Sequence, residues 1–238
     1  MKKYIVCFIL STFAILVSKE INHAQSVAMI NTGKVKPQKS LKYLALGDSY
    51  TKGEGVPYEE SYPALLTTRL KDKGYDVQEL RVIAQTGWTT DDLKNAIKRA
   101  NPSNQYGLVS LLIGVNNQFQ SKSIEEYEKE FRELLLNAIE LAGGQKDKVF
   151  VVSIPDYGIT PFGKSNQAFI SRQIELFNAV NKKVTDNYQV KYFNITPISR
   201  DAEQNADLLC RDGLHPSGSM YKQWVNLMIR EVEDLVKK

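Results

Sequence analysis

Short apolar segments alternate with segments of helical periodicity along most of this chain, and this alternation constrains its fold more than any other feature. The apolar segments are residues 41–46, 77–84, 107–113, 149–154 and 190–195. The helical segments are residues 60–73, 89–100, 124–141, 165–188 and 217–236. Several apolar runs are almost continuous, as expected for strands that are covered by helices on both faces. The pattern therefore predicts a three-layer α/β/α domain with five parallel strands in the flavodoxin-like order 2-1-3-4-5.

The N-terminal segment has the layout of a secretory signal peptide. A basic start at Lys2 and Lys3 precedes an apolar run over residues 4–18, and Ala24 supplies a small residue where cleavage would occur. The run is short for a membrane span, which needs about 20 residues. We therefore expect a signal peptide over residues 1–24 and export to the periplasm or the outside of the cell. An uncleaved N-terminal membrane anchor is the alternative.

A polar segment and one folded domain should follow the signal peptide. Residues 25–40 contain Gly33 and Pro37 without any periodicity, which indicates a flexible tether. Residues 41–238 then form the domain, with no repeat and no second domain. A hydrophobic content of 42% and a charged content of 24% are typical of a globular protein and argue against disorder.

Charge and residue counts exclude several classes of function. The net charge is +4, and removal of residues 1–24, which hold three lysines and one glutamate, leaves about +2. Nucleic-acid binding needs a denser basic face than this. Cleavage would also remove Cys7 and His23, leaving Cys210 as the single thiol and His215 as the single histidine. A disulfide within the mature chain and a histidine-cluster metal site are then both excluded, and we expect no metal and no cofactor.

A serine, a histidine and an aspartate stand where the predicted fold would bring them together. Ser49 directly follows the first predicted strand, and His215 precedes the last predicted helix. Ligands of open α/β sheets bind beyond the carboxyl ends of the strands, which is where Ser49 would lie. A serine hydroxyl needs a base to take its proton, and His215 is the one candidate. Asp212, three residues earlier, would orient the imidazole as the third member of a triad.

The same edge of the sheet would supply donors for an oxyanion. Gly87 follows the second predicted strand, and Asn116 follows the third. The backbone N–H groups of Ser49 and Gly87 and the side-chain amide of Asn116 would stabilise a tetrahedral intermediate. Each segment is a common turn sequence when it is taken alone, and the argument rests on their order and convergence. Cys210 is a weaker nucleophile candidate, because His215 has a better partner in Ser49.

These four segments resemble the blocks of the SGNH (GDSL-type) hydrolase family. They are Gly47-Asp48-Ser49, Gly87, Gly114-Val115-Asn116 and Asp212-Gly213-Leu214-His215. The resemblance runs from about Leu41 to the C-terminal helix. It implies the same roles for Ser49, Gly87, Asn116, Asp212 and His215 as the chemistry above. The nucleophile-elbow pattern Gly-x-Ser-x-Gly of the α/β-hydrolases is absent from the sequence, which fits this family rather than that one.

Neighbours of these residues are candidates for contact with the substrate. We predict contacts from Asp48 and Trp88, which adjoin the nucleophile and the oxyanion glycine. Residues 154–161 follow the fourth strand at the same edge, so Pro155 and Tyr157 would line the cleft. An ordinary turn or a place in the core is the alternative for each.

The sequence thus predicts an exported serine esterase or acyl hydrolase that acts through an acyl-enzyme on Ser49. Its substrates would be small-molecule or lipid esters, and the family resemblance implies a lysophospholipase-like or short-chain acyl esterase. A lipid substrate would involve transient contact with a membrane surface. A carbohydrate O-acetylesterase with the same triad is an alternative. A binding protein of this fold that has lost turnover is a third reading, although Ser49, Asp212 and His215 are all present.

Overall fold

A five-stranded parallel sheet forms the centre of the domain in this computed structural model, which describes residues 40–237. The predicted signal peptide and nearly all of the predicted tether lie outside the described residues. The strands are β1 (Leu41–Gly47), β2 (Val77–Ala84), β3 (Leu108–Leu112), β4 (Val149–Val152) and β5 (Lys191–Phe193). Their order is β2-β1-β3-β4-β5, and every neighbouring pair is parallel. The predicted fold class and strand order are confirmed.

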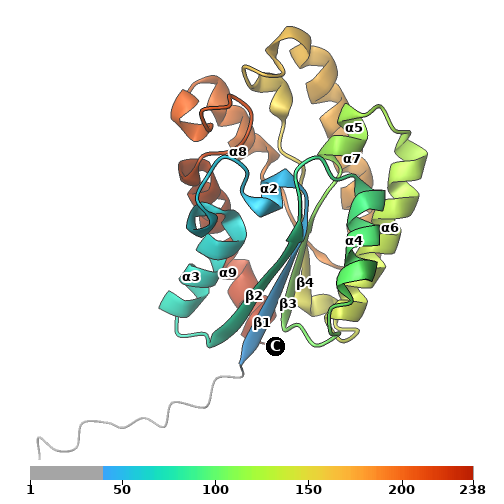
Figure 1. The fold of residues 1–238 in the computed structure, drawn as a ribbon, viewed down its shortest axis with the longest axis vertical. Helices are drawn as coiled ribbons and strands as arrows, with labels where there is room; N and C mark the ends of the chain where they lie inside the picture. Colours follow the sequence, from blue (N-terminus) through green and yellow to red (C-terminus); the bar gives the residue numbers. More distant parts are fainter. Residues whose placement is uncertain (1–39, 238) are drawn as a thin grey trace, which may run out of the picture. The chain divides into compact units, whose positions relative to one another are not determined.

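Within residues 40–237, five long helices cover the two faces of the sheet. They are α3 (Tyr62–Asp72), α4 (Thr90–Ala100), α6 (Ile124–Leu141), α7 (Gln167–Asn187) and α9 (Gly218–Lys237). Helices α3 and α9 lie together on one face, and α4, α6 and α7 lie on the other (Figure 1). Every residue of the central strands β3 and β4 is buried, and β1 is buried except at Lys42, whereas the edge strands β2 and β5 are partly exposed. This explains the continuous apolar runs of the sequence.

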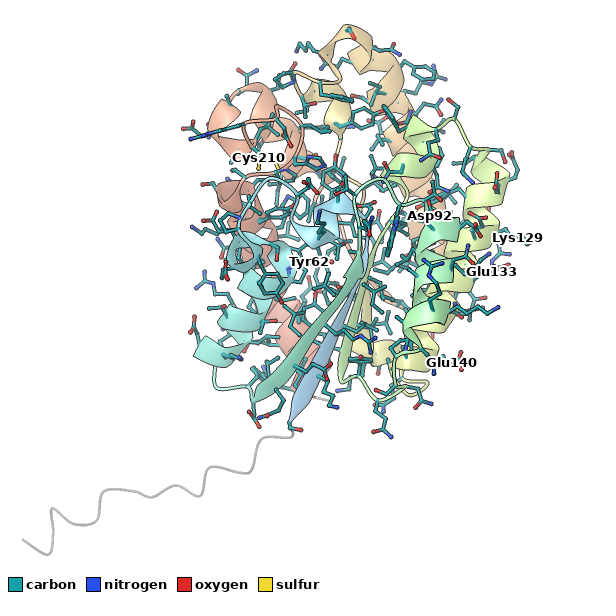
Figure 2. All side chains as sticks on the ribbon, viewed as in Figure 1. Tyr62, Asp92, Lys129, Glu133, Glu140 and Cys210 are labelled. Carbon is teal, nitrogen blue, oxygen red and sulfur yellow. The ribbon has the colours of Figure 1, made fainter. Side chains whose placement is uncertain are left out.

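Local sequence signals set the helix ends close to the predicted positions. Thr89 and Asp92 form a capping box at the start of α4, in which the Thr89 hydroxyl accepts from the Asp92 amide and the Asp92 carboxylate accepts from the Thr89 amide. Figure 2 shows Asp92 at this end of α4. Ser123 caps α6 in the same way by accepting from the amide of Glu126 at 3.1 Å. The chain then leaves α6 through Gly143 and Gly144, both at positive φ.

Short helices, which the sequence patterns do not predict, connect the long elements. Three are α-helical: α2 (Ser49–Lys52), α5 (Val115–Phe119) and α8 (Thr196–Arg200). Six are single 3₁₀ turns: η1 (Tyr58–Glu60), η2 (Lys146–Lys148), η3 (Tyr157–Ile159), η4 (Lys164–Asn166), η5 (Asp201–Glu203) and η6 (Ala206–Leu208). Helices α2 and α5 directly follow β1 and β3, so they lie at the carboxyl edge of the sheet. No helix within residues 40–237 is both long and apolar enough to cross a membrane.

Aromatic side chains fill much of the interior, and two buried tyrosine hydroxyls share one partner. Tyr43 on β1 and Tyr62 on α3 both reach the hydroxyl of Ser110 on β3, at 2.8 and 3.1 Å. The Tyr62 ring also lies 6.2 Å from the ring of Trp224 on α9, which joins α3 to α9. The core beneath the carboxyl edge is therefore densely packed, and it supports the short helices above it.

Candidate active site

The serine turn is built by a glycine and a buried carboxylate. A Cβ at Gly47 would lie 2.4 Å from the backbone oxygen of Leu112, so a larger residue does not fit beside β3. Asp48 then caps α2, with its Oδ1 accepting from the Tyr50 amide at 3.0 Å. Ser49, the first residue of α2, is 4% exposed and lines a cavity at this edge of the sheet. The turn thus fixes the serine at the end of the first strand.

Gly87 lies in the turn between β2 and α4 and lines the cavity. Its φ is +85°, and a Cβ there would meet no atom within 4 Å. A side chain at this position would be strained by the backbone and would project into open space. The glycine leaves its own backbone accessible beside Ser49, because both residues line the same cavity.

Asn116 lies on α5, which begins directly after Gly114. A Cβ at Gly114 would come within 2.6 Å of the Tyr127 ring, and its φ is +132°, so the turn requires glycine. The Asn116 amide donates to the backbone oxygen of Trp88 at 2.9 Å. This bond ties α5 to the turn that carries Gly87. Because an amide group holds two N–H donors, a second donor remains for a ligand.

His215 and Asp212 form a hydrogen-bonded pair before α9. The His215 Nδ1 lies 2.7 Å from the Asp212 Oδ2, and the Asp212 Oδ1 accepts from the amides of Leu214 and His215 at 2.9 and 3.0 Å. Burial acts to raise the pKa of Asp212, but these hydrogen bonds outweigh it and hold the pKa below its ordinary value. An ionised carboxylate only accepts, so Nδ1 carries the hydrogen and the Nε2 of a neutral imidazole is free to accept a proton.

The cavity beside Ser49 has a volume of about 140 Å³ and joins most of the predicted residues. Ser49, Gly87, Asn116, Tyr157 and His215 all line it, and Asp212 reaches it through His215. They come from the ends of β1, β2, β3 and β4 and from the loop before α9. Residues distant in the sequence therefore meet at one point of the carboxyl edge.

Three residues predicted to contact the substrate lie elsewhere. Asp48 is fully buried beneath the serine turn, and its Oδ2 has no hydrogen-bond partner among the described residues. Burial raises its pKa to about 7, with the Tyr50 amide offsetting only part of the effect. The structure corrects the prediction for Asp48, because the carboxylate is a helix cap rather than part of the cavity surface. Trp88 supplies a backbone oxygen to Asn116, and Pro155 is buried; within the described chain neither lines the cavity.

Several lining residues have no signal in the sequence motifs. They are Thr86, Phe119 and Phe162, together with Tyr50, whose ring lies 5.6 Å from that of His215. Val115 and Leu214 also line the cavity and belong to the motif blocks, although the motifs assign them no role. Phe119 and Phe162 are more than half exposed. An unpaired aromatic in the otherwise polar sequence of residues 116–123 is the one available signal for Phe119. Nothing in the sequence near Phe162 indicates its position.

Cys210 lies close to the pair but is not suited to act as a nucleophile. Its Sγ is 3.1 Å from the Pro216 backbone oxygen, and Figure 2 shows it beside the α9 region. Burial, with the charge of Asp212 nearby, raises the pKa of its thiol to about 11. The reactive thiolate is therefore scarce near neutral pH. In residues 40–237 no group of three or more His, Cys, Asp or Glu side chains is placed to hold a metal ion.

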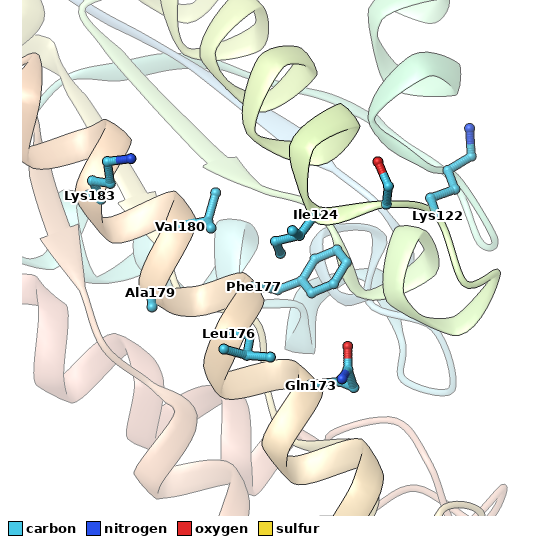
Figure 3. A pocket seen from close by; sticks show the side chains of 9 residues that line it. Lys122, Ile124, Gln173, Leu176, Phe177, Ala179, Val180 and Lys183 are labelled. Carbon is cyan, nitrogen blue, oxygen red and sulfur yellow. The ribbon is translucent and has the colours of Figure 1, made fainter.

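A second hollow, between the start of α6 and α7, lacks comparable chemistry. Its volume is about 580 Å³, and Figure 3 shows that its wall is formed by Ile124, Leu176, Phe177 and Val180, with Lys122 and Lys183 at its edges. Both lysines already pair with glutamates, at 3.4 and 3.2 Å. The smaller cavity beside Ser49 is the one that combines a nucleophile, a base and donors, so it is the candidate active site.

A parallel α/β/α sheet that carries a serine and a His–Asp pair at its carboxyl edge defines a class of serine hydrolases. The model of the GDSL-like lipase/acylhydrolase family matches residues 45–223. The chain belongs to this family of carboxylic ester hydrolases. No curated protein sequence matches the chain.

Solved structures of esterases share the fold. A lipase/acylhydrolase from Enterococcus faecalis is 19% identical, with a TM-score of 0.63 over 82% of this chain and 96% of that one. The psychrotrophic esterase EstA from Pseudoalteromonas sp., in a structure inhibited by monoethylphosphonate, is 16% identical, with a TM-score of 0.61 over 83% and 99%. An acetyl xylan esterase from Geobacillus stearothermophilus is 20% identical, with a TM-score of 0.60 over 81% and 94%.

Proposed function

We propose that this protein is a serine esterase that hydrolyses carboxylic esters through an acyl-enzyme on Ser49. The observation that carries the proposal is the meeting of Ser49, Gly87, Asn116 and His215 in one cavity, with Asp212 bonded to the imidazole. No other arrangement of side chains described above offers a nucleophile together with its base.

Each residue has a chemical task in the proposed reaction. His215 takes the proton of the Ser49 hydroxyl at Nε2 while Asp212 stabilises the imidazolium through Nδ1. The serine oxygen attacks the ester carbonyl, and the amides of Ser49, Gly87 and Asn116 donate to the resulting oxyanion. Each such donor is worth roughly 10²–10³ in rate in other serine enzymes. His215 then returns the proton to the departing alcohol, and water releases the acyl group by the reverse path.

Hydrolysis of p-nitrophenyl esters from acetate to palmitate, by a chain of residues 25–238, tests the proposal. We expect turnover that falls by roughly 10⁴-fold or more in Ser49→Ala, because the nucleophile is lost. Ser103→Ala, an exposed serine in a loop, and Cys210→Ala should retain the activity. Labelling by a fluorophosphonate should likewise vanish only in Ser49→Ala. A wild-type chain that neither hydrolyses an ester nor takes the label would favour the binding protein instead.

A carbohydrate O-acetylesterase is the second candidate. The two half-exposed phenylalanine rings at the cavity favour it, since the apolar faces of sugar rings stack on aromatic side chains. One of the structures with this fold is an acetyl xylan esterase, and another is a lipase/acylhydrolase. The acyl-chain profile of the same ester series separates the two, because an O-acetylesterase should prefer acetate strongly over octanoate and palmitate.

We also propose that the enzyme is exported by a signal peptide that ends at Ala24. The support is the basic start and the apolar run of residues 4–18. Expression of the full chain in a bacterial host, followed by fractionation and N-terminal sequencing, should give a periplasmic or secreted product that begins at Gln25. Full-length protein in the membrane fraction would indicate the uncleaved anchor, and full-length protein in the cytoplasm would contradict export.

A further inference from the structure

Three aromatic rings stand together at the mouth of the cavity. Phe119 lies 6.3 Å from Tyr157 and 6.1 Å from Phe162, measured between ring centroids, and Tyr157 lies 6.3 Å from Phe162. Phe119 is 57% exposed and Phe162 is 53% exposed, whereas Tyr157 is buried beneath them. We call these three residues the aromatic rim.

The aromatic rim is fixed to the parts of the molecule that carry the reaction. Phe119 is the last residue of α5, three positions after Asn116. The Phe162 amide donates to the Gly213 backbone oxygen at 3.2 Å, which joins it to the loop of His215. The Tyr157 hydroxyl donates to the buried Gln118 side chain at 2.8 Å. A group held on the rim is therefore held at a fixed position relative to both the oxyanion donors and the base.

Exposure of these rings is not explained by the fold. Single exposed apolar side chains are normal, and Phe169 on α7, 55% exposed, is such a residue. The rim differs because its three rings touch one another and all line the cavity of Ser49. Contiguous exposed apolar surface beside a cleft usually marks a place that a ligand covers.

The cavity is too small to enclose both the acyl group and the alcohol group of a large ester. Its volume of about 140 Å³ is below the roughly 300–1,000 Å³ typical of sites that enclose a drug-sized ligand. One of these two groups, if it is short, fits beside Ser49, and the other must extend across the aromatic rim. The alcohol has to depart before water can attack the acyl-enzyme, whereas the acyl group stays bonded to Ser49. We therefore assign the solvent-facing position, on the aromatic rim, to the alcohol group of the ester.

We propose that the aromatic rim is the alcohol subsite and that it selects short-chain acyl esters of alcohols with an apolar ring face. This inference rests on the proposed esterase function. In the reaction, the Ser49 oxygen bonds to the acyl carbon, the bond from that carbon to the alcohol oxygen breaks, and the proton from Ser49 reaches the alcohol through His215. Water then yields the short carboxylic acid. The ring face is that of an aryl group or the C–H face of a sugar, which stack on phenylalanine alike.

Paired substrates that differ only in the alcohol test the subsite. Benzyl acetate and ethyl acetate have alcohols of similar acidity, and a 6-O-acetyl methyl glucoside adds a sugar ring on a primary alcohol. In Phe119→Ala/Phe162→Ala we expect kcat/KM for a ring-bearing acetate to fall about tenfold, since aromatic pairs contribute on this order. The value for ethyl acetate should change less than twofold. Loss with benzyl acetate indicates aryl alcohols, and loss with the glucoside acetate indicates sugars.

Two further variants separate the effect of the rings from effects on folding and from the loss of any exposed ring. Phe119→Leu/Phe162→Leu preserves apolar bulk without rings and should show the same selective loss if the double alanine variant folds poorly. Phe169→Ala, on an exposed ring away from the cavity, should leave all three rates unchanged.

Other outcomes overturn the proposal. Equal losses with ethyl acetate and both ring-bearing acetates would mean that the rim only supports the fold of the site. Selective loss with ethyl octanoate would place the acyl chain on the rim. Neither result resembles failure of the esterase function itself, which would appear as a wild-type chain that hydrolyses no ester and takes no fluorophosphonate on Ser49.

Discussion

Asp48 has the most unusual environment of any single residue near the site. Its carboxyl group is fully buried, one oxygen caps α2 and the other has no partner among the described residues. Burial raises the pKa to about 7, so the charged form is costly in the folded protein. The stability of the fold around the serine turn should therefore depend on pH through Asp48, although this side chain does not line the cavity.

Asp48 should make the folded protein less stable as the pH rises from about 4 to about 7. Over this range the native state keeps a proton on Asp48 that the unfolded chain has lost, so the free energy of unfolding falls with pH. Asp48→Asn keeps the shape without the charge and removes this dependence. Between pH 5 and pH 8, the wild type should lose about 2–3 kcal/mol more stability than the variant. Urea unfolding of both proteins at the two pH values measures the difference, and parallel pH profiles would contradict it.

At the scale of elements, α4 and α5 hold each other in place around the oxyanion donors. Asn117, fully buried on α5, accepts from the Thr90 amide at 3.0 Å and donates to the Thr90 hydroxyl at 2.5 Å. Asn116 beside it donates to the Trp88 backbone oxygen. The segment directly after Gly87 is thus bound to α5 at Trp88 and at Thr90, so the two donors keep their separation without a ligand, as preorganised catalysis requires.

The same elements show what the sequence can predict. Helices α6 and α9 and strand β2 follow long periodic or apolar patterns, and their predicted ends lie within about one residue of the structure. Helices α2 and α5 have four and five residues, too few for a periodic signal. They form because buried side-chain bonds and the glycines before them fix the chain, and such tertiary causes are not visible in a local pattern.

The sequence predicts candidate site residues where chemistry requires a particular residue type. The motifs point to Ser49, His215 and Asn116 because a nucleophile, a base and a donor cannot be replaced by similar residues, and all three line one cavity. Phe119 and Phe162 carry no such signal, because no step of the chemistry requires a phenylalanine. Asp48 adjoins Ser49 in the sequence, but its side chain is buried whereas that of Ser49 lines the cavity. Nearness in sequence is a poor guide to a shared surface.

At the scale of the whole molecule, the site depends on every layer of the domain. Its residues follow four different strands, and the loop of His215 is held by one backbone bond within the loop and one from a distant part of the chain. The Cys210 amide donates to the His215 oxygen at 2.8 Å, and the Phe162 amide bonds to the same loop at Gly213. Directly after that loop, α9 packs on α3 through Trp224 and Tyr62. Displacement of α9 or of the sheet edge would therefore move the base away from Ser49.

This dependence predicts that activity and fold are lost together. For residues 39–238, which cluster as one compact unit, esterase activity and far-UV circular dichroism should fall with the same urea midpoint. A single cooperative transition of this kind is the usual behaviour of one domain. Dilution of urea during the assay must be avoided, so both signals are read at equilibrium in each urea solution. Phe169→Ala, which alters an exposed ring away from the cavity, serves as the control variant. Activity lost at clearly lower urea than the dichroism would mean that the His215 loop opens locally while the sheet remains folded.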